Sequence, residues 1–281
     1  AVAAGVITFV VDNVDELWKL IPYRHSIRVM LRLSFIAPDA PIDLSRKFGA
    51  PQQDALSILD VANDSGIRVD GLCFHVGSQA ATANTHADAL GVCLDLCEQI
   101  KAEGLPEILR IDIGGGFPAH YIGESVDLNA FCKPIRDVLN RVPEHLEILA
   151  EPGRVISASS MALVCKVVGR AKRRDGWWFY LDDGVYGAQS GRLFDGMRYR
   201  MSVFTSSDEL SPCVFAGPTC DSIDELGRYP EFPILNMNDV IVFHEMGAYT
   251  LASATQFNGI APPAVVTRAL PELRKGYGHS L

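Results

Sequence analysis

Short apolar runs alternate with amphipathic segments along the first half of the chain. The apolar runs predict β-strands at residues 6–11, 27–35, 69–76, 108–113 and 146–150. Between them, apolar residues recur at helical spacing, which predicts helices at residues 14–19, 52–65, 85–103 and 128–142. Strands that alternate with helices are typical of a parallel α/β sheet, and strands that are apolar along their whole length are typical of a sheet covered by helices.

Polar residues and glycines gather where these strands end, in the stretches FHVGSQ (74–79), DIGGGFP (112–118) and AEPGR (150–154). A (β/α)8 barrel builds its active site at the carboxyl ends of its strands. Only five strand–helix units are visible, whereas eight are needed to close a barrel. We therefore interpret residues 1–157 as part of a (β/α)8 barrel and expect about three N-terminal units to be absent from this chain.

After residue 157 the pattern changes to short apolar runs separated by Gly, Pro and Asp, without a long helical segment. The runs lie within residues 161–187, 211–220, 239–247 and 262–270. This pattern predicts a second, mostly antiparallel β domain, a barrel or a sandwich, over residues 158–281.

Charge and cysteine content exclude several classes of function. The formal net charge of −9 and the pI near 5.2 argue against a surface for nucleic acids or membranes. No apolar stretch has the roughly 18 residues of a membrane span. The seven cysteines are scattered, and Cys93 and Cys97 have no further ligands at zinc-site spacing, so we expect reduced thiols in a cytoplasmic protein without a metal site.

The three consecutive glycines, Gly114, Gly115 and Gly116, follow a predicted strand directly. Glycine loses more backbone entropy on folding than any other residue. Three of them indicate a tight turn, a left-handed backbone, or an anion bound by bare amide groups, and we interpret the anion as a phosphate. The run is neither a Walker loop nor a G-x-G-x-x-G fingerprint, and the chain has no G-x-S-x-G elbow.

Two further groups of residues at these strand ends have both a structural and a functional interpretation. His75 is either a hydrogen-bonded core histidine or a ring packed on an aromatic ligand, with Ser78 donating to that ligand. Glu151 and Arg154 form either an internal ion pair or a ligand site, with Arg154 on a phosphate and Glu151 on a protonated ring nitrogen.

Cys220 and Asp221 leave a Gly-Pro turn side by side. They form either a surface loop or a functional pair, since an exposed thiol beside a carboxylate is unusual in a reduced protein.

The stretches FHVGSQ, DIGGGFP and AEPGR resemble, in order and spacing, the fold-type III pyridoxal-phosphate-dependent decarboxylases of basic amino acids, the ornithine decarboxylase family. The resemblance also includes KFGA (47–50), DDGVYG (182–187), GPTCDSID (217–224), GAYT (247–250) and FNG (257–259). It implies a TIM barrel with a β domain, a cytoplasmic homodimer with two shared active sites, and pyridoxal 5′-phosphate as cofactor. The implied reaction converts L-ornithine, or L-lysine, to putrescine or cadaverine in polyamine biosynthesis.

The resemblance also implies a role for each matching residue. The phosphate would be held by Ser78, Gly114, Gly115, Gly116, Arg154 and Tyr249. His75 would stack on the cofactor ring and Glu151 would pair with its nitrogen. Cys220, reaching into the partner subunit's site, would help protonate the carbanion left by carbon dioxide. The substrate would be bound by Asp221, Asp195 and Phe257, and Lys47 would pair with Asp224 across the dimer.

Two departures from the family limit these expectations. Asp195 stands in Phe-Asp-Gly rather than the usual Tyr-Asp-His, which weakens any choice between ornithine and lysine. A diaminopimelate decarboxylase is less similar, since that group has Glu-Ser after the cysteine where this chain has Asp221-Ser222.

The second departure is the Schiff-base lysine, which the family has on the first barrel strand and which no lysine of this chain replaces. We therefore expect a truncated or partly recorded decarboxylase. The alternatives are an inactive homologue that regulates by binding, similar to antizyme inhibitors, and an unrelated phosphate-binding barrel such as an isomerase, which would leave the Cys220–Asp221 loop unexplained.

Overall fold

The computed structural model describes residues 1–36, 44–122 and 125–267. The chain forms two compact units. The first contains Ala1–Ala162, Arg198–Arg200 and His244–Ala248, and the second contains Leu163–Met197, Met201–Phe243 and the residues from Tyr249 onward.

The first unit is built on a five-stranded sheet whose strands are all parallel and lie in sequence order. The strands are β1 (Thr8–Val11), β2 (Arg28–Leu33), β3 (Val69–Phe74), β4 (Arg110–Asp112) and β5 (Glu147–Leu149). Each lies within the apolar run that predicts it. The parallel sheet expected from the alternation of strands and helices is therefore confirmed.

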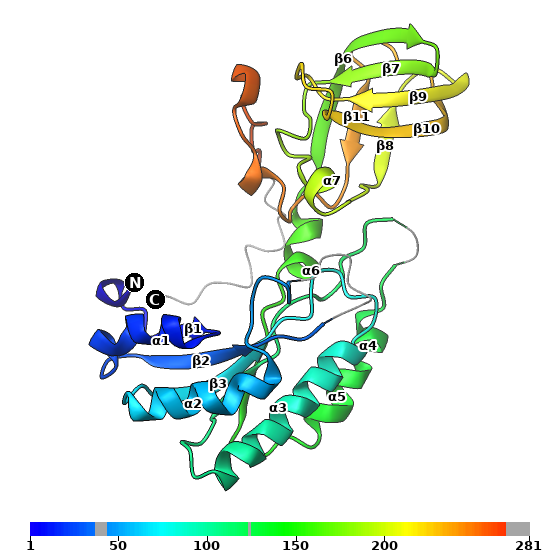
Figure 1. Cartoon of the computed structure of the whole chain (residues 1–281). Helices are drawn as coiled ribbons and strands as arrows, with labels where there is room; N and C mark the ends of the chain where they lie inside the picture. The colour runs from blue at the N-terminus through cyan, green and yellow to red at the C-terminus, as the bar shows by residue number, and fades with distance from the viewer. Residues whose placement is uncertain (37–43, 123–124, 268–281) are drawn as a thin grey trace, which may run out of the picture. The chain divides into compact units, whose positions relative to one another are not determined.

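Helices pack against one face of this sheet (Figure 1). They are α1 (Val14–Leu20), α2 (Ala55–Asp64) with the preceding 3-10 turn η3 (Gln52–Asp54), α3 (Asn84–Ala102), α4 (Leu128–Phe131) and α5 (Lys133–Leu139). The Asn13 side chain accepts a hydrogen bond from the Glu16 amide, which caps the start of α1. The core between helices and sheet is apolar, and its largest fully buried side chains are Leu17, Leu31, Leu33, Leu72, Phe74, Leu90, Ile100 and Ile111.

The single helix predicted over residues 128–142 is wrong, because the structure has two short helices there. The chain turns at Cys132 between α4 and α5, and Pro134 stands in the first turn of α5. Proline has no amide hydrogen to continue an earlier helix but fits the first turn of a new one. The apolar residues keep their helical spacing across this break, so the sequence pattern does not reveal the break.

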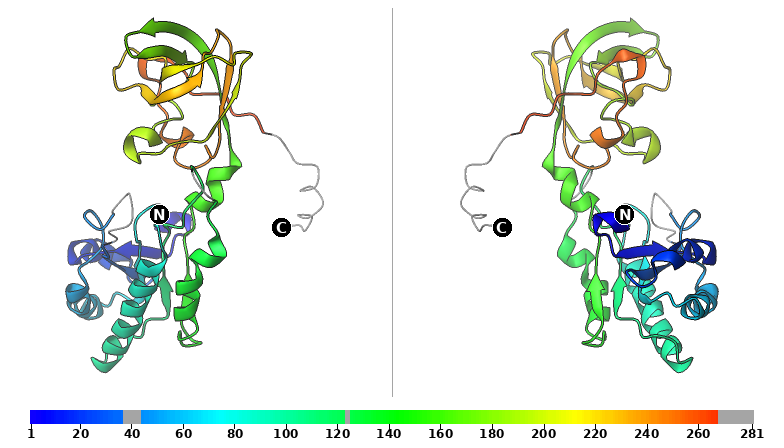
Figure 2. Two further views of the ribbon diagram at one scale, coloured as in Figure 1. Left: turned by 90° about the vertical axis from the view of Figure 1, so that its right-hand side faces the viewer. Right: turned by 90° about the vertical axis from the view of Figure 1, so that its left-hand side faces the viewer.

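The second unit is built on a strongly curled six-stranded sheet with the order β10-β9-β7-β6-β11-β8 (Figure 2). Its strands are β6 (Leu163–Arg173), β7 (Gly176–Leu181), β8 (Met201–Phe204), β9 (Leu210–Ala216), β10 (Glu225–Pro233) and β11 (Val240–Phe243). All pairs are antiparallel except β7 with β9. The predominantly antiparallel arrangement is as predicted.

The two edge strands, β8 and β10, were not predicted, and one predicted strand is absent. β10 contains Pro230 and Pro233 and many polar residues, a composition that an edge strand tolerates and an apolar-run criterion overlooks. Residues 262–267 of the predicted run 262–270 form no strand, and residues 268–270 lie outside the described part of the chain.

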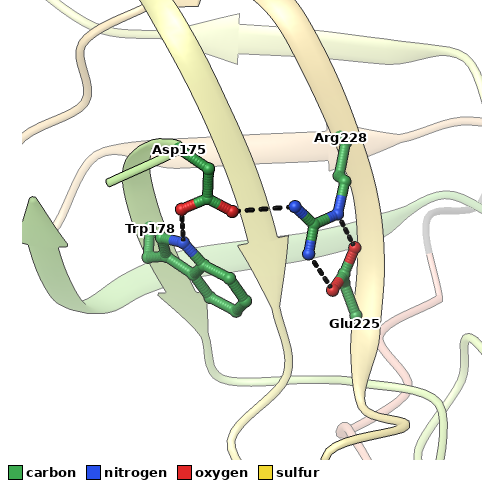
Figure 3. Close-up of polar contacts among 4 residues, drawn as sticks. All are labelled: Asp175, Trp178, Glu225 and Arg228. Carbon is green, nitrogen blue, oxygen red and sulfur yellow. Dashed lines mark hydrogen bonds and ion pairs between the residues drawn. The ribbon is translucent and has the colours of Figure 1, made fainter. Parts of the chain in front are cut away.

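A surface network connects the β6–β7 turn to the edge strand β10 (Figure 3). Arg228 donates two hydrogen bonds to Glu225, of 2.6 and 2.9 Å, and a third of 2.8 Å to Asp175. Asp175 also accepts a 2.9 Å hydrogen bond from the Trp178 indole. Asp175 and Arg228 are exposed to solvent and Glu225 is half-buried, so solvent screens these charges and we assign the network little stability.

Two short connections complete the described part of the chain. The helix α6 (Arg154–Ser157) and the 3-10 turn η4 (Ala158–Ser160) lead out of β5, and α7 (Gly191–Phe194) follows β7. Single 3-10 turns lie at Val2–Ala4, Ile21–Tyr23, Leu251–Ser253 and Phe257–Gly259. None of the helices in the described ranges has the length and apolar character needed to cross a membrane.

Leu72 offers a test of the first unit's core. It is fully buried in the central strand β3, and Leu72→Ala should lower the free energy of unfolding by about 3 kcal/mol, because it removes apolar contacts and leaves a cavity. Leu128 is 42% exposed at the start of α4, so Leu128→Ala is the matched control and should change stability by less than about 1 kcal/mol. Urea unfolding of both variants provides the comparison, and equal losses would contradict this core assignment.

Candidate functional site

The glycine segment, residues 114–116, follows β4 and lies in close contact with the backbone at the end of β3. Gly114 and Gly116 have positive φ angles of 68° and 95°, which glycine adopts without strain. A Cβ atom at Gly114 would overlap the Phe74 carbonyl oxygen, and one at Gly116 would overlap the Gly77 carbonyl oxygen. The tight turn and the left-handed backbone are therefore both present, and the neighbouring backbone explains the absence of side chains.

In the glycine segment all three carbonyl groups are hydrogen-bonded within the protein, whereas, within the described part of the chain, two of the three amide groups are not. The carbonyl oxygens of Gly114, Gly115 and Gly116 accept from Glu151 N, His86 Nε2 and Ala80 N at 2.8, 2.9 and 3.0 Å. The Gly114 amide donates to Asp112 Oδ1 at 2.8 Å. Among the described residues, the Gly115 and Gly116 amides donate to no protein acceptor. Two amides without a protein acceptor are groups that could hold an anion.

His75, directly after β3, lies against this segment with a neutral ring. The pKa of His75 is lowered to about 4, mainly by burial and further by the positive charge of Arg32 and by the His86 ring. Its Nδ1 accepts a 3.0 Å hydrogen bond from the Gly77 amide, so Nε2 carries the proton. A Cβ atom at Gly115 would lie 3.1 Å from that Nε2. Because Gly115 has no side chain, only backbone atoms of the glycine segment lie near Nε2 of this neutral imidazole.

Two carboxylates lie at the ends of β4 and β5. Burial raises the pKa of Asp112 and of Glu151, and the negative charge of Asp112 adds to the rise at Glu151, while Arg32 opposes it. The Glu151 side chain is exposed. Both interpretations of Glu151 and Arg154 stay predictions.

Arg154 is buried at the start of α6, with 6% of its surface exposed. It donates from Nε to the Ser78 hydroxyl and from Nη1 to the Tyr121 hydroxyl, both at 3.1 Å. Ser78 and Arg154 are 76 positions apart in the sequence and meet at the carboxyl end of the sheet. The predicted residues His75, Ser78, Glu151 and Arg154 and the glycines are thus brought together on one edge of the first unit.

Sequence reasoning missed four residues of this edge. Arg32 and Asp112 are charged residues within β2 and β4, and a charge within a predicted strand is a signal that could have identified them. Tyr121 lies in a loop, and His86 lies on the buried side of α3. Their sequence surroundings carry no comparable signal, because their partners come from distant segments.

A second cluster lies in the second unit around Cys220 and Asp221. The Tyr186 hydroxyl donates a 2.6 Å hydrogen bond to Asp221, which is the main cause of a lowered pKa at this carboxyl group. The Tyr186 ring stacks on Phe257 with 4.2 Å between centroids. Cys220 is exposed, and its sulfur accepts a 3.3 Å hydrogen bond from the side-chain amide nitrogen Nδ2 of Asn258. Cys220, Asp221 and Phe257 are thus brought together, with Tyr186 as the residue that joins them.

The remaining predicted residues are more scattered. Asp224 is 3% exposed and accepts hydrogen bonds from the Val185 amide and from the Thr219 amide and hydroxyl. Lys47 is exposed in the first unit, with its ammonium group 5.0 Å from the centre of the Phe48 ring. The pairing of Lys47 with Asp224 across a dimer stays a prediction.

Asp195 and Tyr249 belong to the second unit. Asp195 is half-buried at the end of α7, and Tyr249 is 58% exposed with a positive φ of 54°. Their expected roles also stay predictions. Within the described residues, no group of three or more His, Cys, Asp or Glu side chains is arranged to bind a metal ion.

Comparison with known proteins identifies the family that this edge resembles. The family model for the pyridoxal-binding domain of pyridoxal-dependent decarboxylases matches residues 1–158. A lysine/ornithine decarboxylase of Selenomonas ruminantium is 35% identical over 94% of this chain and 67% of its own length. The ornithine decarboxylase of Caenorhabditis elegans is 34% identical over 90% of this chain and 63% of its own. Antizyme inhibitor 2 of Xenopus laevis is 28% identical over 97% and 65%.

Solved structures agree with these sequence matches. The lysine/ornithine decarboxylase of Vibrio vulnificus in complex with cadaverine is 42% identical, with a TM-score of 0.87 over 93% of this chain and 69% of that one. The structure called SrLDC, in complex with PLP and cadaverine, is 34% identical, with a TM-score of 0.85 over 96% and 69%. The chain spans 67%, 58% and 65% of the length of the first three curated relatives.

The close approach at Gly114 can be tested with a glycine of similar backbone conformation. Gly104, after α3, has a φ of 72° and nothing within 4 Å of an added Cβ atom. Gly104→Ala should lower the free energy of unfolding by about 1 kcal/mol, because only the left-handed backbone opposes it. Gly114→Ala, which also meets the Phe74 carbonyl, should lower it by about 3 kcal/mol or more. Thermal or urea unfolding measures both, and similar losses would show that the Phe74 contact is unimportant.

Proposed function

Because this chain belongs to the pyridoxal-dependent decarboxylases, we propose that it decarboxylates L-ornithine, or L-lysine, to the corresponding diamine, a step of polyamine biosynthesis. The observation that carries the proposal is the anion site of unused amides beside a neutral histidine and an exposed carboxylate. Relatives in complex with cadaverine and putrescine support a diamine product.

The cofactor is pyridoxal 5′-phosphate, and the residues of the first unit fit it. The Gly115 and Gly116 amides and the buried Arg154 guanidinium suit a phosphate, and Ser78 lies within hydrogen-bond distance of Arg154. Tyr249 is assigned to the same phosphate on the family resemblance alone. When bound, the cofactor ring accepts the electron pair that remains after carbon dioxide leaves.

Two side chains orient and polarise the ring. His75 is neutral, so it can lie flat on the ring without placing a second positive charge beside a protonated nitrogen. Glu151 is exposed at the end of β5 and supplies the negative charge that keeps the ring nitrogen protonated. Asp112 adds negative potential at the same edge, and Arg32 limits it. These groups stabilise charge where the reaction develops it.

The cluster in the second unit suits a substrate with a distal ammonium group. Asp221 and Asp195 supply carboxylates for that group, and Phe257 packs on the aliphatic chain. Tyr186 holds the Asp221 carboxylate in place. The Cys220 thiol delivers a proton to the carbon that has lost its carboxylate. We assign these residues to the site of a partner subunit in a cytoplasmic homodimer in which Lys47 pairs with Asp224, and the parallel sheet to part of a (β/α)8 barrel.

Product analysis tests the reaction itself. The full-length protein with pyridoxal 5′-phosphate should release carbon dioxide and putrescine from L-ornithine, or cadaverine from L-lysine. Borohydride reduction before intact-mass measurement should add the mass of one reduced cofactor per subunit. A protein that takes up no cofactor and releases no diamine would instead favour a binding protein, the function suggested by the similarity to antizyme inhibitor 2.

Glu151→Gln separates the proposed electrostatic role from cofactor binding. Glutamine keeps the size of the side chain but removes its negative charge, so the ring nitrogen loses its counter-charge. We expect kcat to fall by on the order of 100-fold or more, since groups of this kind contribute that much. The dissociation constant of pyridoxal 5′-phosphate should change by less than about threefold. Steady-state kinetics and a cofactor titration measure both, and an unchanged kcat would remove Glu151 from the mechanism.

Coexpression of two inactive variants tests whether the sites are shared. Glu151→Gln and Cys220→Ala each damage one half of a site, and each homodimer should be strongly impaired. If each site combines halves from two subunits, random pairing places one intact site in half of the dimers and restores about a quarter of the wild-type activity. Differently tagged subunits allow the heterodimer to be purified and assayed. An inactive heterodimer would contradict the shared-site arrangement.

A further inference from the structure

His86, in the first turn of α3, is fully buried although it is polar. Its ring packs against Phe117 and Phe131, with centroids 5.1 and 6.1 Å away. Its Nε2 donates to the Gly115 carbonyl oxygen at 2.9 Å. Its Nδ1 has no hydrogen-bond partner among the described residues. An apolar side chain of similar shape would avoid burying this unsatisfied nitrogen, so the Gly115 contact is the feature that distinguishes histidine at this position.

The geometry defines which nitrogen carries the proton. A carbonyl oxygen can only accept, so Nε2 must be the donor whether or not Nδ1 is protonated. Burial lowers the pKa of His86, and the hydrogen bond to Gly115 partly offsets this effect. The neutral Nε2–H form therefore predominates near neutral pH, and the donor is present across the physiological range.

The peptide group that His86 holds is the one that presents an unused amide. In a trans peptide the C=O and N–H bonds point in opposite directions, and the group is planar. A hydrogen bond that fixes the Gly115 oxygen toward α3 therefore also fixes the Gly116 N–H on the opposite side. Gly116 has no Cβ atom and a positive φ, so without such a contact this peptide plane could rotate at little cost.

We propose that His86 is a positioning residue that orients the Gly115–Gly116 peptide, so that the Gly116 amide faces the phosphate of the cofactor. The proposal rests on the assignment of the glycine segment to that phosphate. His86 touches neither the ring nor the substrate in this arrangement. It acts on affinity for the phosphate through the backbone that it holds.

Three substitutions separate the hydrogen bond from the packing. His86→Phe keeps an aromatic ring between Phe117 and Phe131 but removes the donor. His86→Gln places an amide nitrogen near the position of Nε2, whereas His86→Asn places one near Nδ1 and cannot reach Gly115. Phe131→Leu is the packing control, because it alters the contact with the His86 ring and leaves the donor in place.

The measurement is the dissociation constant of the full-length apoprotein for pyridoxal 5′-phosphate and for pyridoxal, which lacks the phosphate. Loss of the donor should weaken binding of the phosphate form about tenfold, the size expected for one buried hydrogen bond, and leave pyridoxal binding unchanged. His86→Gln and Phe131→Leu should stay within about threefold of wild type for both ligands. The phosphorus NMR shift of the bound cofactor should change in His86→Phe and not in Phe131→Leu.

The outcomes distinguish this inference from the proposed function. If the wild-type protein binds pyridoxal as tightly as its phosphate, the glycine segment does not hold the phosphate, and the proposed site fails. If the wild type prefers the phosphate form and His86→Phe retains the same preference and the same phosphorus shift, only the role of His86 is overturned. Should His86→Phe fail to fold, His86→Gln and His86→Asn decide, since equal phosphate preference in both would contradict the proposal.

Discussion

The backbone at Gly114 passes so close to the Phe74 carbonyl that no side chain fits between β4 and the end of β3. Much of the site in the first unit depends on this contact. It lets the segment after β4 turn under His75, and it brings the Gly114 carbonyl to the Glu151 amide at the end of β5. Three strand ends are thereby joined through main-chain atoms. The remaining carbonyls of the glycine segment are held by His86 and Ala80, which leaves the Gly115 and Gly116 amides for a ligand.

The electrostatics of the same edge follow from burial more than from ion pairing. Desolvation is the main cause of the raised pKa of Asp112 and Glu151 and of the lowered pKa of His75. Each of these groups is shifted toward its neutral form, and Arg32 is the nearby positive charge that moderates Glu151. A site arranged in this way suits the cofactor proposed above, which carries both a positive ring nitrogen and a negative phosphate.

Periodicity predicted the five parallel strands because each is a short apolar run with a polar residue or glycine at its end. It failed where a local exception overrides the pattern: Pro134 divides a predicted helix, and β10 combines prolines with polar residues at a sheet edge. His75, Ser78, Glu151 and Arg154 could be identified because parallel strands place their carboxyl ends together. Tyr121 and His86 could not, since neither lies at the end of a predicted strand, and only the structure shows their contacts with Arg154 and Gly115.

In the second unit, the Cys220–Asp221 loop is held by a carboxylate rather than by an apolar core. Asp224 is buried and accepts hydrogen bonds from Val185 and Thr219, on both sides of the loop. A Cβ atom at Gly184 or Gly217 would overlap the Asp224 carboxylate. Gly184 and Gly217 therefore make room for the Asp224 carboxylate, just as Gly114 and Gly116 of the first unit make room for neighbouring backbone. Breaking a buried polar contact of this kind is more costly than losing an exposed one, so Asp224 fixes the exposed Cys220 and the half-buried Asp221 in a defined conformation.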